Sequence, residues 1–131
     1  TTELVSIIES AVGAKYFYMK HPEREIFQAI RMEVNHELQV LENVLPEAIS
    51  LLKNGGRICV ITFHSLEDRI VKRIFKRLSE VDPMVQGLPE IPEAYQPKIK
   101  LITKKPILAS EEEIKENPRS KSAKLRIIER V

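Results

Sequence analysis

The stretch RICVITF at residues 57–63 decides how this chain is expected to fold. It is almost continuously apolar and rich in β-branched residues, and the pair Gly55-Gly56 precedes it. Such a run is typical of a strand that is covered on both faces, so we predict an interior strand of a parallel sheet. Cys59 lies within this run, which predicts a buried thiol in a reducing compartment rather than half of a disulfide.

The residues after this strand predict a helix that packs against it. Ser65 and Asp68 have the spacing of a capping box, with Ser65 as the N-terminal cap. Apolar residues then recur at steps of three and four, as on one face of an amphipathic helix. They are Leu66, Ile70, Val71, Ile74, Phe75 and Leu78.

The N-terminal part of the chain also shows helical spacing. Residues 3–12 place Leu4, Ile7, Ile8 and Val12 on one stripe, which predicts a short amphipathic helix. Gly13 is a suitable C-terminal stop for this helix. A linker containing Tyr16, Phe17 and Tyr18 is expected to follow.

A longer apolar pattern predicts one helix over residues 22–45. Pro22 suits the first turn of a helix, because its missing N–H would have no partner there. Pro46 is expected to break or kink the helix, and residues 47–53 are expected to form a second short helix. A turn at residues 54–56 then leads into the strand.

The C-terminal part alternates between loops and short elements. Residues 80–98 hold several prolines and Gly87, which predicts a surface loop. Residues 99–101 and 123–127 alternate apolar and charged side chains, as half-exposed strands do, and predict an antiparallel hairpin at a sheet edge. Between them, Ser110 and Glu113 form a second capping pattern before a short helix that ends at Asn117-Pro118.

Composition excludes several classes of protein. With 131 residues, 43% of them apolar and 31% charged, one compact globular domain is expected. The sequence holds no apolar stretch long enough to span a membrane and no secretory leader, so we expect a cytoplasmic protein. No His, Cys or acidic cluster has metal-ligand spacing, and a net charge of +2 does not by itself indicate nucleic-acid binding. The order of elements indicates an α/β fold and nothing more specific.

Three sequence segments indicate a family within the α/β class. They are HPEREIFQAIRMEVNHEL at 21–38, GGRICVITFHSLEDRIVKRIF at 55–75 and KPILASEEEIKENPRSKSAKLRIIER at 105–130. In order and spacing they resemble the C-terminal signatures of the MraW (RsmH) family. Members of that family use S-adenosylmethionine to methylate the exocyclic N4 of a cytidine in small-subunit ribosomal RNA. The resemblance therefore implies an rRNA (cytosine-N4-)methyltransferase with small-subunit rRNA as its partner.

The resemblance also implies a domain organisation. The family fold is a class I, Rossmann-like methyltransferase sheet with a helical domain inserted in it. Residues 1–20 would be the end of that insertion with a linker, and residues 21–131 the C-terminal part of the methyltransferase domain. The chain is thus expected to be a C-terminal fragment that lacks the N-terminal half of the enzyme.

No cofactor site is expected in this chain. In the family, the Gly-rich turn and the acidic residue that hold the methyl donor lie in the N-terminal half, and residues 1–131 contain no match to them. Gly55-Gly56 precede a strand instead of opening a helix after one, which is the wrong context for holding a nucleotide. The isolated chain is therefore predicted to be inactive.

His64 and Ser65 are the best candidates for contact with the substrate, because ligands of open α/β sheets gather at the carboxyl ends of strands. The alternatives are a structural imidazole for His64 and a helix cap for Ser65. No paired nucleophile or carboxylate identifies a general base beside them, so no catalytic residue is assigned.

Other polar residues form a stripe and two clusters. The stripe, on the helix from Pro22, could bind RNA or the missing domain, or it could be a solvated flank; it holds Arg24, Gln28, Arg31, Asn35 and Glu42. Either basic cluster could contact rRNA phosphates or be a solvated face. The first holds Lys72, Arg73, Lys76 and Arg77, and the second holds Arg119, Lys121, Lys124 and Arg126. Few aromatic residues lie in these clusters, so base stacking is not indicated.

Two hypotheses of function remain. The first is the fragment of an rRNA methyltransferase described above, and the second is a non-catalytic RNA-binding or structural module built on the same part of the sheet. In both, the strand at 57–63 lacks one neighbour and exposes a long apolar edge. We expect that edge to bind the missing N-terminal half or to form a homo-oligomer.

Overall fold

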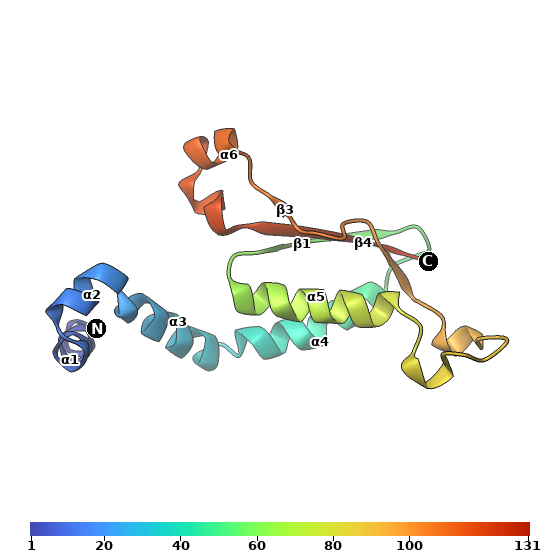
Figure 1. The fold of residues 1–131 in the computed structure, drawn as a ribbon, viewed down its shortest axis with the longest axis horizontal. Coiled ribbons are helices and arrows are strands. Elements are labelled where there is room, and N and C mark those ends of the chain that lie inside the picture. The colour runs from blue at the N-terminus through green and yellow to red at the C-terminus, as the bar shows by residue number, and fades with distance from the viewer. The chain divides into compact units, whose positions relative to one another are not determined.

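The computed structural model describes all residues from Thr1 to Val131 and divides into two compact units. Unit 1 comprises Thr1–Glu37 and unit 2 comprises Leu38–Val131. Helices and a small antiparallel sheet make up the chain, which agrees with the predicted α/β class (Figure 1). The division of the chain into residues 1–20 and 21–131 refers to the family's organisation and stays a prediction.

Unit 1 contains three helices, α1 (Thr2–Val12), α2 (Ala14–Lys20) and α3 (Pro22–Val34). Gly13 ends α1 as predicted, with a φ of 81° that suits glycine. The expected linker around Tyr16–Tyr18 is wrong, because these residues form α2 and bury Phe17. Three aromatic residues in a row give no helical period of their own, so tertiary packing of Phe17 decides this segment.

The predicted helix over residues 22–45 is in fact two helices. α3 ends at Val34, and α4 (Glu37–Ser50) begins after His36, whose φ of 52° is left-handed. A left-handed residue cannot continue a right-handed helix. The apolar spacing runs on through the break, which is why the sequence pattern did not reveal it.

Pro46 lies inside α4, and the separate helix predicted at residues 47–53 does not exist. Leu45 and Ile49 are both buried, one helical turn apart, on the same face of α4. Burial of that face holds the helix across the proline despite the lost hydrogen bond. The helix ends at Ser50 instead.

The sheet is built around its last strand. β4 (Lys124–Arg130) pairs antiparallel with β1 (Arg57–Thr62) and with β2 (Ile99–Leu101), in the order β1-β4-β2. β3 (Ile107–Leu108) also pairs antiparallel with β4. The prediction of an interior parallel strand is wrong for this chain, because β1 is an end strand paired only with antiparallel β4. The predicted hairpin pairing is antiparallel as expected, but β4 is central and not at an edge.

The turn before β1 requires its two glycines. Gly55 has a φ of 79°, and its N–H donates to the carbonyl of Arg130 at 2.8 Å. At Gly56 a Cβ atom would lie 2.9 Å from the carbonyl oxygen of Lys53. The Gly56 carbonyl accepts a 2.8 Å hydrogen bond from the Arg130 N–H. This turn therefore closes the end of the β1–β4 ladder.

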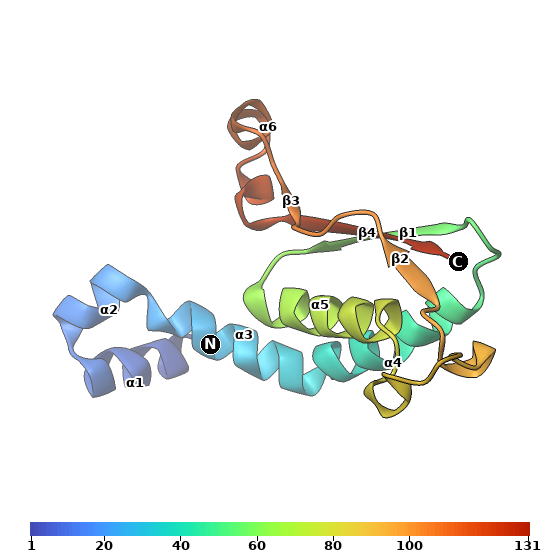
Figure 2. The ribbon, with the colours of Figure 1, turned by 45° about the vertical axis from the view of Figure 1, so that its right-hand side comes forward.

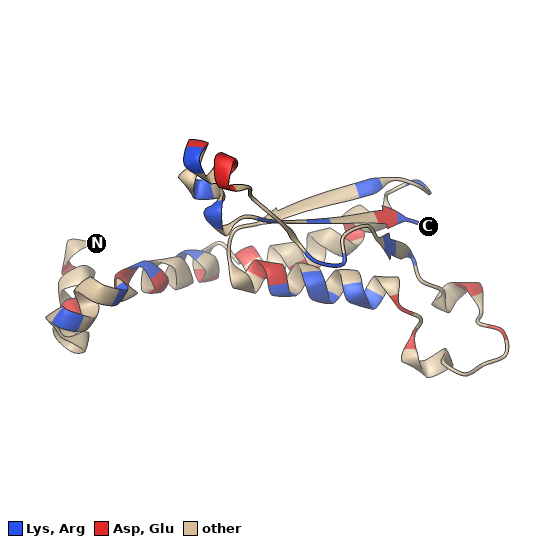
Figure 3. Ribbon diagram, turned by 45° about the horizontal axis from the view of Figure 1, so that its top comes forward, with Lys and Arg blue, Asp and Glu red and all other residues tan.

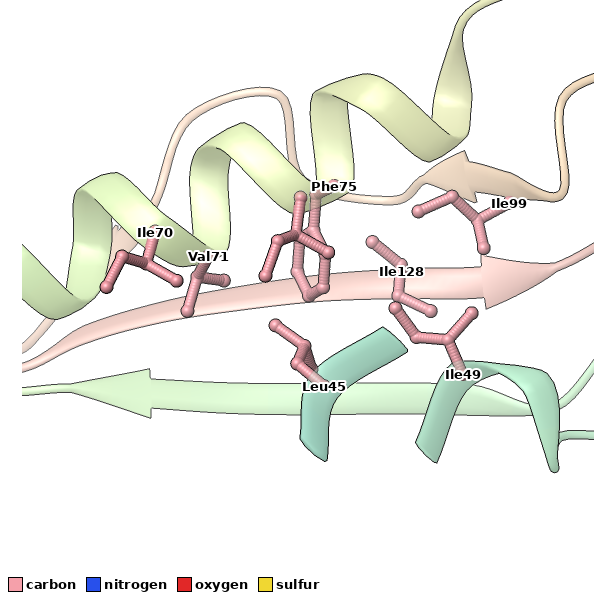
Figure 4. Packing of buried hydrophobic residues seen from close by; sticks show 8 residues of the cluster. Leu45, Ile49, Ile70, Val71, Phe75, Ile99 and Ile128 are labelled. Carbon is pink, nitrogen blue, oxygen red and sulfur yellow. The ribbon is translucent and has the colours of Figure 1, made fainter. Parts of the chain in front are cut away.

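Helices α4 and α5 (Ser65–Ser79) lie on one face of the sheet (Figures 1 and 2). Charged residues recur along α5, as Figure 3 shows, while Ile70, Val71, Ile74 and Phe75 are buried. Figure 4 shows Ile70, Val71 and Phe75 packed with Leu45 and Ile49 of α4 and Ile128 of β4, and Ile74 belongs to the same cluster. The predicted apolar stripe of α5 is thus confirmed as the centre of the core from Ile70 onward, whereas Leu66 at its start is 38% exposed.

The opposite face of the sheet is not covered within unit 2. Register places Cys59 opposite Ile127 and Ile61 opposite Leu125, on the face away from α4 and α5. Cys59 is exposed, so the prediction of a buried thiol is wrong, and Ile61 is 58% exposed. The pattern over residues 57–63 therefore suits a strand with two apolar faces, of which this chain covers one.

The remaining segments largely follow the predictions. Residues 80–98 form a loop with two short 3₁₀ turns, at Pro83–Val85 and Glu93–Tyr95. Ser110 caps α6 (Glu111–Glu116), with its hydroxyl accepting from the Glu113 N–H at 3.2 Å. A further 3₁₀ turn, Pro118–Ser122, leads into β4. None of the helices is both long and apolar enough to cross a membrane.

An ion pair joins the first turn of α5 to the centre of the sheet. Arg126 of β4 is buried, and its guanidinium donates from Nε to Asp68 Oδ1 at 2.7 Å and from Nη2 to Oδ2 at 3.2 Å. Lys124 Nζ lies 3.5 Å from the same carboxylate. The hydrogen bond from Arg126 lowers the pKa of Asp68, although desolvation opposes this shift. The pair fixes where α5 begins relative to β4.

Substitution Asp68→Asn is expected to lower the free energy of unfolding by about 2 kcal/mol, because the buried Arg126 loses its counter-ion and keeps only an amide oxygen as acceptor. Chemical unfolding of the two proteins measures this difference. The matched control is Arg57→Gln, which breaks an exposed pair with Glu129 and should cost about 0.5 kcal/mol or less. Equal losses for both substitutions would contradict a structural role of the Asp68 pair.

The contribution of this pair should also depend on pH. Asp in an unfolded chain has a pKa of about 3.9, and the pKa of folded Asp68 is lower. The stabilisation is therefore complete above about pH 4 and is lost as the pH falls through the folded-state pKa. The difference in unfolding free energy between the unsubstituted protein and Asp68→Asn should shrink on acidification. A difference that grows below about pH 4 would exclude this linkage.

Candidate functional site

The turn at the carboxyl end of β1 is held by His64 and Glu67. His64 is the N-terminal cap of α5, and its Nδ1 accepts from the Glu67 N–H at 3.3 Å. Glu67 Oε2 accepts in return from the N–H groups of Phe63 at 2.9 Å and His64 at 3.3 Å. The capping box is thus one residue earlier than predicted, and the assignment of Ser65 and Asp68 to it is wrong. Asp68 is engaged by Arg126 instead.

The cap determines which nitrogen of His64 can donate. Because Nδ1 accepts a hydrogen bond, the neutral ring carries its proton on Nε2. Nε2 is buried and has no hydrogen-bond partner, although it lies 3.3 Å from Glu67 Oε1. His64 therefore has a structural role and also a spare donor.

Ser65 is the first residue of α5 and is exposed. Because His64 takes the capping position, the Ser65 hydroxyl is left without that role. Phe63, beside it, is 56% exposed. The end of β1 thus places a hydroxyl, an imidazole and an aromatic ring next to one another along the chain.

The predicted polar stripe is not one continuous face, since the helix breaks at His36. In unit 1, Arg31 donates to Glu37 from Nε at 2.8 Å and from Nη2 at 3.1 Å, and Asn35 donates to the same carboxylate at 3.2 Å. Gln28 is half-buried. In unit 2, Glu42 forms an ion pair with Arg73 of α5. Within unit 1, the structure groups Arg31 and Asn35 around Glu37.

The first basic cluster lines a pocket that the sequence did not reveal. Lys72, Arg73, Lys76 and Arg77 are exposed on α5. Arg73, Lys76 and Arg77 border a cavity of about 600 Å³ between the end of α5 and the loop at residues 80–98. Tyr95 and Lys98 of that loop line the same cavity. The loop returns an aromatic residue to the cluster from far along the chain, which spacing alone could not show.

The second basic cluster is divided by the structure. Arg119 and Lys121 are exposed on the 3₁₀ turn before β4. Arg126 is buried against Asp68, and Lys124 is directed to the same carboxylate. The strand alternation of β4 turns residues 124 and 126 to the face that α5 covers. Arg126 therefore cannot meet rRNA phosphates. Of the second basic cluster, Arg119 and Lys121 remain candidates for contact with rRNA phosphates.

The residues present do not fit S-adenosylmethionine. The turn at Gly55-Gly56 is closed by hydrogen bonds to Arg130, and the Lys53 carbonyl blocks the space beside Gly56. The cavity at the end of α5 is bordered by four cationic and two acidic side chains, and the excess of positive charge would repel a sulfonium. A second cavity, of about 470 Å³ in unit 1, is bordered by Lys15 and Lys20. We therefore assign no donor site and no donor-dependent step to these residues.

Comparison with known proteins supports the resemblance seen in the sequence. A family model described as the MraW methylase family matches residues 1–131. A ribosomal RNA small subunit methyltransferase H from Lactobacillus delbrueckii subsp. bulgaricus is 55% identical over 132 residues. The match covers all of this chain and 42% of that relative, so the chain spans less than half of the relative's length. With its whole length matched by the family model, the chain belongs to the MraW methylase family.

Proposed function

We propose that the chain is the C-terminal part of a cytoplasmic methyltransferase that transfers a methyl group from S-adenosylmethionine to N4 of a cytidine in small-subunit rRNA. The observation that carries the proposal is the 55% identity, along the full chain, to a ribosomal RNA small subunit methyltransferase. The sheet would then be the C-terminal half of a Rossmann-like methyltransferase sheet. Residues 1–20 would end an inserted helical domain, and residues 21–131 would belong to the methyltransferase domain.

The contribution of this chain would be to the binding of the target and not of the donor. Methyl transfer requires the donor and the attacking amine to be held in line, which is a positioning task. His64 and Ser65 lie where β1 ends, the place at which open α/β sheets bind ligands. The exposed Ser65 hydroxyl would hydrogen-bond the target nucleotide, with the half-buried His64 beside it. Gln28, Arg31 and Asn35 would contact RNA or the remainder of the enzyme.

The uncovered parts of the sheet would bind the remainder of the enzyme. β1 has a strand neighbour on one side only, and it carries neither Lys nor Pro to discourage pairing at the other. Its outward face is apolar at Cys59 and Ile61. The part of the relative that this chain does not span would supply a further strand and covering helices. These would bury the free side of β1 and its apolar outward face.

The isolated chain is expected not to bind S-adenosylmethionine and not to methylate rRNA, because it has no site that fits the donor. Calorimetric titration of the 131 residues with S-adenosylmethionine measures this directly. The full-length protein that contains them serves as the positive control. Micromolar binding to the isolated chain would overturn the assignment of the donor site to the missing part. Salt-dependent rRNA binding by a full-length protein without donor binding would favour the non-catalytic module.

The isolated chain is also expected to self-associate, because the free side of β1 is unprotected. Light scattering over a concentration series should give an average mass that rises above that of the monomer. Ile61→Lys places a charge on the exposed face of this strand and should lower the association. Ile107→Lys, at a residue of β3 that is similarly exposed, is the matched control. A monomer mass at every concentration would contradict association through β1.

A further inference from the structure

The cavity at the end of α5 is formed by residues whose positions are fixed. Lys98 follows the proline-containing loop directly, and its N–H donates to the Leu78 carbonyl of α5 at 2.9 Å. Its neighbour Ile99 is 1% exposed in the core. On the opposite wall, α5 is held by Ile74 and Phe75, which are buried. The cavity of about 600 Å³ is therefore bounded by a helix and by a loop that is tied to it.

The charges around this cavity leave cations available to a ligand. Arg73 is paired with Glu42, and Lys76 lies 3.9 Å from Glu80. Arg77 and Lys98 form no ion pair. Of the two acidic residues at the cavity, Glu80 faces Lys76, and Asp82 accepts a 2.9 Å hydrogen bond from the Met84 N–H. An anion between Arg77 and Lys98 would thus meet two cations that have no ion-pair partner, in a cavity whose four cations outnumber its two carboxylates.

An aromatic ring borders the same cavity. Tyr95 belongs to the 3₁₀ turn Glu93–Tyr95 and is 42% exposed. Its N–H donates to the Pro92 carbonyl at 2.9 Å, which holds the turn. Gln96 next to it donates from Nε2 to the Ile91 carbonyl at 3.3 Å, which leaves its amide oxygen as an acceptor. A half-exposed ring beside unpaired cations is the combination that binds single-stranded RNA.

We propose that this cavity binds one nucleotide of single-stranded RNA, with its phosphate between Arg77 and Lys98 and its base stacked on Tyr95. The inference rests on the proposed function, because it identifies a second contact with the same rRNA, away from the end of β1. Cationic side chains position the RNA backbone, and an unpaired base requires a flat apolar partner. An acidic peptide would use the cations but has no need of the exposed ring.

The test uses the full-length protein that contains this chain, with small-subunit rRNA and with the small subunit as substrates. The double variant Arg77→Gln/Lys98→Gln should raise KM for rRNA about tenfold and leave kcat within about twofold. RNA binding by this double variant should depend less steeply on salt concentration than RNA binding by the unsubstituted protein. Tyr95→Ala should weaken RNA binding about tenfold, whereas Tyr95→Phe should keep it.

The matched control is Lys53→Gln/Lys104→Gln, which removes the same charge from two exposed residues outside the cavity. Equal losses in the control and in the cavity variant would show a general charge effect and would overturn the proposal. So would a loss of binding to the small subunit without any loss of binding to naked rRNA, since the occupant would then be a protein segment. All variants lie at exposed positions, and thermal unfolding verifies that they fold.

An incorrect functional assignment and an incorrect cavity site would give different experimental results. If the unsubstituted protein does not methylate small-subunit rRNA, the assigned activity is wrong. Binding of single-stranded RNA by the unsubstituted and substituted proteins still decides whether the cavity holds a nucleotide. Unchanged RNA binding in both Tyr95→Ala and the double variant would disprove the cavity site even in an active enzyme.

Discussion

Unit 2 depends on the pairing of β4, because this strand is the neighbour of every other strand in the sheet. It pairs with β1 from Arg57↔Glu129 to Thr62↔Lys124 and with β2 and β3 along its other side. Ile128 of the same strand is fully buried between α4 and α5. Arg126 ties the strand to the first turn of α5. One strand thus sets both the order of the sheet and the position of the helix.

This arrangement explains how the chain places its polar groups at two separate sites on α5. At the N-terminal end, the cap formed by His64 and Glu67 occupies the backbone N–H groups and leaves one imidazole N–H unpaired. At the C-terminal end, cations gather beside Tyr95 of the returning loop. The buried face of α5 holds the two ends at a fixed separation, because a helix between them is rigid on the scale of a nucleotide.

The sequence predicted the parts of the fold that depend on local spacing. The apolar steps of α5, the stop at Gly13 and the cap at Ser110 are all visible within a few residues, and the structure confirms them. Features decided by distant contacts were missed. Pro46 stays inside a helix because Leu45 and Ile49 are buried by other elements, and Arg126 leaves its basic cluster because Asp68 faces it. The cavity at Tyr95 was missed for the same reason, since the ring and the cations are far apart in sequence.

The position of β4 in the sequence has a consequence for synthesis. Thr62 at the end of β1 and Lys124 at the start of β4 are 62 residues apart. Translation proceeds at about 5–20 residues per second, so β1 emerges from the ribosome seconds before its partner exists. During this interval, a nascent β1 has two open sides and two apolar faces. A chaperone that shields such segments would protect the chain most in this interval, before the ribosome releases β4.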